Sequence, residues 1–118
     1  MQDFRNLQVW KKSHEFTLKI YKITCDFPRE EMFGLTSQIR RASSSVATNI
    51  AEGCGRSSDA ELIRFLYISM GSASESEYLI LLSYDLKYIN SADMSSLISS
   101  IQEIKMMLSA LIKTLKKQ

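Results

Sequence analysis

The sequence predicts an all-α protein, an antiparallel up-down four-helix bundle that forms a single domain over residues 1–118. Three observations favour this fold class. Breakers are scarce, with one Pro and four Gly in 118 residues, which leaves few turns for a β fold. Apolar residues recur at steps of three and four along four segments. The connections between these segments are short, so consecutive helices are expected to pack antiparallel.

The first two segments cover about residues 6–26 and 31–52. In the first, the helical stripe consists of Trp10, His14, Thr17, Tyr21 and Thr24. The dipeptide Phe27-Pro28 ends it, because the residue before proline is disfavoured in the helical region. In the second, a regular apolar stripe consists of Leu35, Ile39, Ala42, Val46 and Ile50. Gly53 and Gly55 then supply a C-terminal stop signal.

The last two segments cover about residues 58–89 and 93–116. Ser58 and Glu61 have the spacing of a capping box at the start of the third helix. Small residues dominate the middle of both the second and third segments, which lets these two helices approach closely. The apolar stripes of the last two segments are wider than a lone bundle needs. We therefore expect the protein to pack against further copies of itself.

The net charge of +2 is too small to indicate a nucleic-acid-binding protein by itself. Residues 1–56 are more basic than residues 57–118, which permits a basic face in the first half. Two Cys without a C-x-x-C spacing and a single His predict no metal site, and no cofactor is expected. The N-terminus lacks a signal-peptide layout and no apolar run reaches about 20 residues, so we expect a cytoplasmic protein without membrane contact.

Basic side chains are the candidate binding residues. Those that could contact the phosphates of RNA or DNA are Lys11, Lys12, Lys19, Lys22, Arg40, Arg41, Arg56 and Arg64. The alternative is that several of the arginines form structural pairs with carboxylates across the second and third helices. The polar residues that would form such pairs or fix the helix register are Asn49, Glu52, Glu75 and Glu77. The sequence leaves both readings open.

A catalytic site is not expected. Cys54 and the serine run at residues 43–45 have no base nearby in the sequence, and His14 is the only histidine. The Gly-rich stretch of residues 52–56 is compatible with a phosphate cradle at a helix N-terminus, but a plain helix–helix turn also needs glycine. It lacks the lysine and the spacing of a P-loop, and the plain turn is the favoured reading.

Several strings in the chain carry a resemblance to a known family. They are Phe4-x-x-Leu7-x-Val9-Trp10, Ile20-Tyr21, Phe27-Pro28, Glu31-x-x-Gly34-Leu35-x-x-Gln38-x-Arg40-Arg41-Ala42, Ser45-Val46-x-x-Asn49-Ile50-Ala51-Glu52-Gly53-x-Gly55-Arg56, Phe65-Leu66 and Gly71-Ser72-x-x-Glu75. Together they resemble the bacterial four helix bundle protein family, also called the 23S rRNA intervening-sequence protein family. The resemblance covers nearly the whole chain and is weakest from about Ser91 onward. One departure is Ser69-Met70, where the family usually has Ala and a second apolar residue, which affects packing more than function.

The resemblance implies an antiparallel four-helix bundle that assembles into a ring-like homopentamer. Some family members are encoded within sequences that interrupt large-subunit ribosomal RNA genes. The related accessory variability determinant proteins of retroelements form positively charged barrels that are thought to bind nucleic acid and a reverse transcriptase. The resemblance carries over no catalytic residues, and it marks Arg40, Arg41 and Arg56 as family-pattern basic positions. The leading hypothesis is therefore a non-catalytic homo-oligomer that binds RNA or DNA, and the alternative is a protein-interaction scaffold with no nucleic-acid role.

Overall fold

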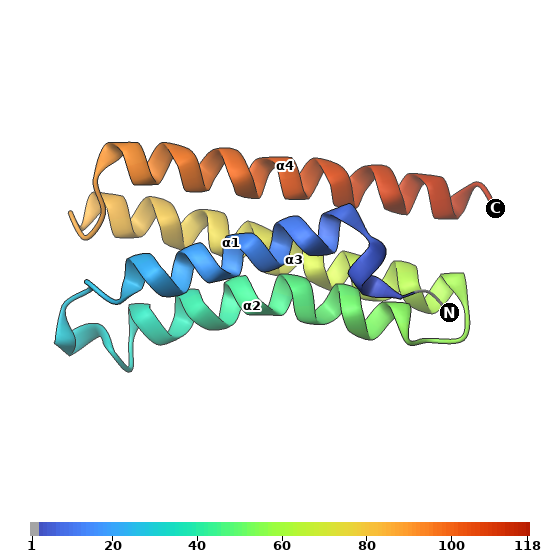
Figure 1. The fold of residues 1–118 in the computed structure, drawn as a ribbon, viewed down its shortest axis with the longest axis horizontal. Coiled ribbons are helices and arrows are strands. Elements are labelled where there is room, and N and C mark those ends of the chain that lie inside the picture. The colour runs from blue at the N-terminus through green and yellow to red at the C-terminus, as the bar shows by residue number, and fades with distance from the viewer. Residues whose placement is uncertain (1–2) are drawn as a thin grey trace.

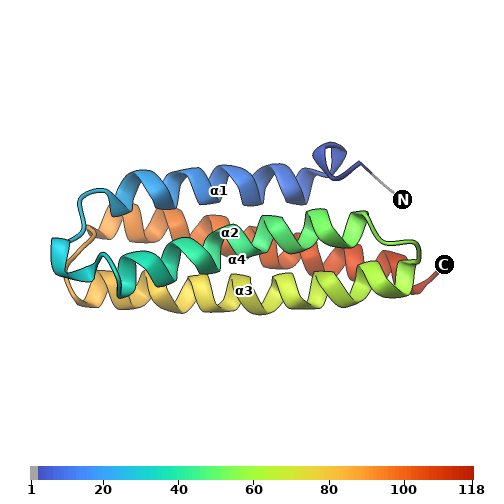
Figure 2. The ribbon, with the colours of Figure 1, turned by 90° about the horizontal axis from the view of Figure 1, so that it is seen from below.

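Four long helices pack side by side in a computed structural model that describes residues 3–118 (Figure 1). They are α1 (Gln8–Thr24), α2 (Leu35–Cys54), α3 (Asp59–Asp85) and α4 (Ser91–Lys116), with short 3-10 turns η1 (Phe4–Asn6) and η2 (Arg29–Glu31). No strand occurs among residues 3–118. The bundle measures 46 × 24 × 20 Å. The α2–α3 connection lies at the same end as the C-terminus, and the α1–α2 and α3–α4 connections lie at the other end (Figure 2). The predicted fold class is thereby confirmed.

The core is a continuous apolar cluster between the four helices. The side chains without any exposed surface include Ile20, Val46, Ile50, Leu66, Ile80, Ile101 and Leu108. On α2 every residue of the predicted stripe is buried. Burying an aliphatic side chain of this size contributes about 1.5–3 kcal/mol, so these rows hold the bundle together.

The stripe predicted for the first helix is wrong at His14 and Tyr21, whereas Thr24 is buried as predicted. His14 and Tyr21 are exposed, and the buried row of α1 is Val9, Ser13, Phe16, Ile20 and Thr24. The physical reason is that the core row includes Ser13, a polar residue outside the predicted stripe, and hydroxyl residues in this row are hydrogen-bonded within the helix. The Ser13 hydroxyl donates to the Val9 carbonyl at 2.7 Å, and the Thr24 hydroxyl donates to the Ile20 carbonyl at 2.6 Å. A hydroxyl satisfied in this way is tolerated inside the core.

A buried hydroxyl also links α2 and α3. Ser69 on α3 is fully buried, and its hydroxyl donates to the Val46 carbonyl on α2 at 2.6 Å. This bond fixes the height of one helix against the other at mid-length. Because the two helices run antiparallel, a residue that precedes Val46 on α2 lies level with the residue that follows Ser69 on α3 by the same number of positions.

The helix ends differ from the expected boundaries by a few residues. The segment 29–31 forms η2, and α2 begins at Leu35, where the Glu31 carboxylate accepts the Leu35 amide at 3.1 Å. Helix α3 ends at Asp85 because Lys87 adopts φ 67° and the Tyr88 amide donates back to the Ser83 carbonyl at 2.9 Å. This hydrogen-bond pattern is a Schellman motif, which stops a helix.

Candidate nucleic-acid interface

The basic side chains of α1 lie on its outward surface. Lys11, Lys19 and Lys22 are exposed, and none has an ion-pair partner within residues 3–118. Lys12 differs, because its Nζ pairs with a carboxylate oxygen of Glu103 on α4 at 3.2 Å. Residues at steps of three and four share a helix face, so Lys12, Glu15, Lys19 and Lys22 form one row that includes a single acidic residue. The candidate surface on α1 therefore carries an excess of positive charge.

This row borders the groove between α1 and α4. Two shallow pockets lie there, and their linings include Lys12, Lys19 and Lys22 from α1 with Glu103 and Asp93 from α4. The acidic residues of α4 face the inner edge of the row. A polyanion would therefore meet the lysines from the outer side of α1, away from α4.

Arg40 is a structural residue. Its Nε donates to the Thr24 hydroxyl at 2.8 Å, and Nη2 donates to the Tyr21 carbonyl at 3.3 Å. The guanidinium also lies 4.7 Å from the centroid of the Tyr21 ring. These contacts fasten α1 to α2. Its neighbour Arg41 is exposed and has no ion-pair partner among the described residues.

Arg56 and Arg64 converge on one aromatic ring. Their guanidinium carbons lie 4.8 and 4.7 Å from the centroid of Phe65. Each also pairs with a carboxylate close in sequence, Arg56 with Glu52 and Arg64 with Glu61, both at 3.2 Å. The two pairs are solvent-exposed, and such pairs contribute little to stability. A phosphate group can therefore compete with either carboxylate.

The ion pairs expected between arginines and carboxylates across α2 and α3 do not form within residues 3–118, and none of the four polar residues named for them bonds across these two helices. Asn49 donates to the Ser45 carbonyl of its own helix at 2.8 Å, and Glu52 binds Arg56 near the end of α2. Glu77 faces α4 instead, where it accepts from Lys105 at 3.1 Å and from Gln102 at 3.2 Å.

The hydrogen bond from Lys105 is the main reason why the pKa of Glu77 lies below its usual range. Glu75 is exposed and makes no side-chain hydrogen bond within residues 3–118. No sequence pattern indicated the Glu77–Lys105 pair, because 28 residues separate its members. The same holds for the bond from Lys116 to the Tyr67 hydroxyl at 2.7 Å, which spans 49 residues.

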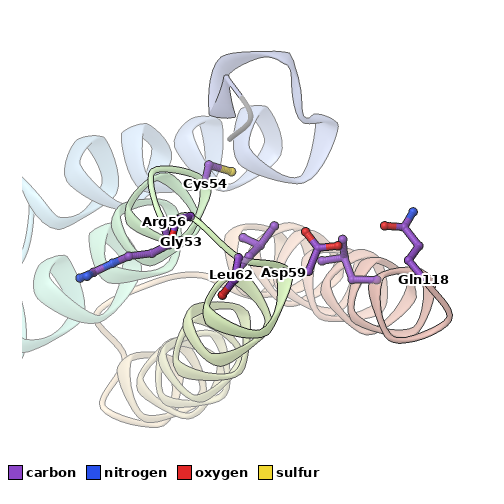
Figure 3. Close-up of a pocket in the computed structure, with 9 residues that line it drawn as sticks. Gly53, Cys54, Arg56, Asp59, Leu62 and Gln118 are labelled. Carbon is purple, nitrogen blue, oxygen red and sulfur yellow. The ribbon is translucent and has the colours of Figure 1, made fainter.

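The Gly-rich turn between α2 and α3 borders a cavity of about 330 Å³ (Figure 3). Its lining includes Asp59 and Gln118, and Arg56 extends away from both (Figure 3). Ser58 accepts the Glu61 amide at 3.2 Å and so caps α3, but the Glu61 carboxylate binds Arg64 instead of completing the capping box. A carboxylate in the lining and an arginine that extends away from it disfavour anion binding, so the geometry supports the plain-turn reading.

The side chains considered for metal binding or nucleophilic catalysis have the following surroundings in the described chain. Within residues 3–118, no group of three or more His, Cys, Asp or Glu side chains is placed to hold a metal ion. Cys54 is buried, and this burial raises the pKa of its thiol, which lowers its reactivity. His14 stacks on the Trp10 ring, with 5.1 Å between the ring centroids. None of the helices in the described part of the chain is long and apolar enough to cross a membrane.

The fold and these surfaces define a small four-helix bundle with exposed basic side chains on α1, α2 and α3. Residues 5–110 match the model of the 23S rRNA-intervening sequence protein family, and the chain belongs to that family. Among solved structures, it is similar to a protein from Bacteroides thetaiotaomicron that is described as of unknown function and from the S23 ribosomal protein family. The two chains are 31% identical, with a TM-score of 0.80 over 89% of this chain and 98% of the other. No curated protein matched significantly.

Proposed function

We propose that this protein is a non-catalytic, homo-oligomeric binding module that contacts the phosphates of RNA or DNA through the outer surface of α1. The observation that carries the proposal is the set of exposed lysines on α1, Lys11, Lys19 and Lys22, which have no acidic partner in the described chain. Membership of a family named for 23S rRNA intervening sequences supports the choice of nucleic acid as the ligand.

The chemistry of these lysines favours binding without sequence preference. An ammonium group on a flexible four-carbon stem acts as a point charge, and it does not impose the bidentate geometry by which arginine reads a base edge. Affinity then comes from the release of counterions around the phosphates and falls steeply with salt. Arg56 and Arg64 are further exposed cations that can extend the contact, whereas Arg40 is engaged between α1 and α2.

Self-association is part of the proposal. Large apolar side chains remain exposed on single copies, and Phe33 reaches 94% exposure with Tyr78 at 60% and Met106 at 74%. Surfaces of this kind in a small protein commonly mark an interface. The family resemblance implies five copies in a ring, and light scattering on the purified protein measures that number directly.

Fluorescence anisotropy tests nucleic-acid binding. A labelled RNA hairpin and a DNA duplex are titrated with protein at low and at near-physiological salt. Combined substitution of Lys11, Lys19 and Lys22 by Glu is expected to abolish measurable binding while the helical circular dichroism signal remains. A matched triple variant, with Lys87, Lys113 and Lys117 changed to Glu, has the same change in net charge away from α1. Equal loss in both variants, or retained affinity in the α1 variant, would contradict the proposal.

A protein-interaction scaffold is the second candidate function, and the exposed side chains of Phe33, Tyr78 and Met106 favour it. In that case a well-formed oligomer would bind neither nucleic acid even at low salt. A single protein would then be recovered with it at fixed stoichiometry after nuclease treatment.

A further inference from the structure

The outward face of α3 combines large side chains with a gap between them. Tyr67, Ile68, Tyr78 and Leu81 are 51%, 42%, 60% and 43% exposed. Gly71 lies between them, is itself exposed, and has no atom within 4 Å of the position that a Cβ would occupy. A glycine in a helix interior costs about 1 kcal/mol relative to alanine. Nothing in the same chain approaches this glycine, so its presence points to a close neighbour from outside.

The outward face of α2 is made of small side chains. Ser37, Arg41, Ser44 and Thr48 follow at steps of four, three and four and therefore share one face. Apart from Arg41, their side chains are short, so a second helix can approach the backbone of α2 closely. Protruding residues on α3 and a flat surface on α2 are complementary shapes for helix packing.

The register within one copy places these two faces at matching heights. The bond between the Ser69 hydroxyl and the Val46 carbonyl sets α2 against α3 at 2.6 Å. Counting away from that bond in opposite directions brings Ser44 level with Gly71 and Ser37 level with Tyr78.

The same counting brings Arg41 to the level of Glu75, one residue from an exact match. Both side chains are exposed, and neither has an ion-pair partner within residues 3–118. Phe33, which precedes α2 and is 94% exposed, comes level with the partly buried Leu82.

We infer that copies of this chain join head-to-tail, with α3 of one copy packed antiparallel on the outer face of α2 of the next and with Arg41 paired to Glu75 across the boundary. This inference rests on the self-association proposed above. Helices α2 and α3 are neighbours in the bundle (Figure 2), and the two proposed contact faces belong to different helices, so one copy can use both faces at once. In a closed ring of parallel bundles, the same residue lies at the same height along the ring axis in every copy. Residues of α2 and α3 that are level within one copy are therefore also level across the boundary between two copies.

Charge reversal tests this interface. Arg41→Glu, Glu75→Arg and the double swap are compared with wild-type protein by light scattering and sedimentation over a range of protein concentrations, without nucleic acid. Each single variant is expected to weaken assembly at least about tenfold, because like charges then face each other, and the double swap is expected to restore it. Lys113→Glu, a charge reversal on α4, serves as the control and should leave assembly unchanged. All three positions are exposed, so the helical circular dichroism signal should stay the same.

Three results would overturn the inference, and they differ in what they say about self-association. If Glu75→Arg disrupts assembly and Arg41→Glu does not, α3 packs on α3 of another copy around a two-fold axis. If neither variant changes a stable oligomer, copies meet through another surface and only this interface is refuted. If the wild-type protein is monomeric at every concentration, the proposed self-association fails as well.

Discussion

Gly53 of α2 lies in close contact with α3, and its replacement by alanine tests the packing of the two helices. A Cβ at this position would lie 2.8 Å from the Cβ of Phe65 and 2.9 Å from Cδ1 of Leu62. The Phe65 Cβ is fixed to its backbone, so the two helices have to separate locally. Overpacking of this kind costs about 1–3 kcal/mol, and the higher helix propensity of alanine returns up to about 1 kcal/mol. We expect Gly53→Ala to lower the free energy of unfolding by about 1–2 kcal/mol.

Gly71→Ala is the matched control, because the same substitution there meets no atom of its own chain within 4 Å. It should raise the free energy of unfolding by about 1 kcal/mol through helix propensity alone. Both variants are made in the Arg41→Glu background, so that assembly does not contribute, and are unfolded in urea at one protein concentration. Equal stability of the two variants would refute the close approach of α2 and α3 at Gly53.

Three further predictions follow from single contacts. Lys87→Gly should raise the free energy of unfolding by up to about 1 kcal/mol, measured as a higher urea midpoint, because Lys87 has φ 67° and glycine adopts this conformation without strain. Because the pKa of Glu77 is lowered in the folded protein, its bond with Lys105 stabilises the fold at pH values above the usual carboxyl pKa. This stabilisation is lost as the pH falls through the lowered pKa. The difference in free energy of unfolding between wild type and Glu77→Gln should therefore shrink in acid. A thiol reagent should modify the exposed Cys25 rapidly and the buried Cys54 only on unfolding, and Cys25→Ser should remove the rapid phase.

The fold class followed from the sequence, and the buried face of a helix was predicted correctly where its core row is apolar. The stripe on α2, from Leu35 to Ile50, is buried as predicted because each of its residues is aliphatic. On α1 the same reasoning selected Trp10 and Tyr21, whose large rings lie at the edge of the bundle, over the row that contains Ser13. Hydropathy ranks serine as a surface residue, and only the hydrogen bond to the Val9 carbonyl explains its burial.

The candidate site was less predictable, because whether a basic side chain is free or engaged depends on partners that are far apart in the sequence. Arg40 and Arg41 are adjacent and chemically identical, yet the first is bonded to Thr24 and Tyr21 and the second is unpaired in the described chain. A helix turns by 100° per residue, so neighbouring side chains point in different directions. Deciding which arginine faces α1 required the positions of both helices, which the sequence pattern located only to within a few residues.

Two sets of unpaired charges in the described chain have separate roles in these proposals. In the proposed assembly, Arg41 and Glu75 lie on the faces of α2 and α3 that meet the next copy, whereas the exposed lysines of α1 lie on a different helix and stay accessible. A ring therefore repeats the α1 surface once per copy, and several weak phosphate contacts act together on one nucleic acid. Arg41→Glu should consequently weaken binding to a long RNA by at least about tenfold although Arg41 does not touch it, and the double swap with Glu75→Arg should restore the affinity. Binding to an RNA too short to reach two copies should be the same in all these proteins. If the long RNA binds the dissociated variant as tightly as the wild type, each copy acts alone and assembly has no part in recognition.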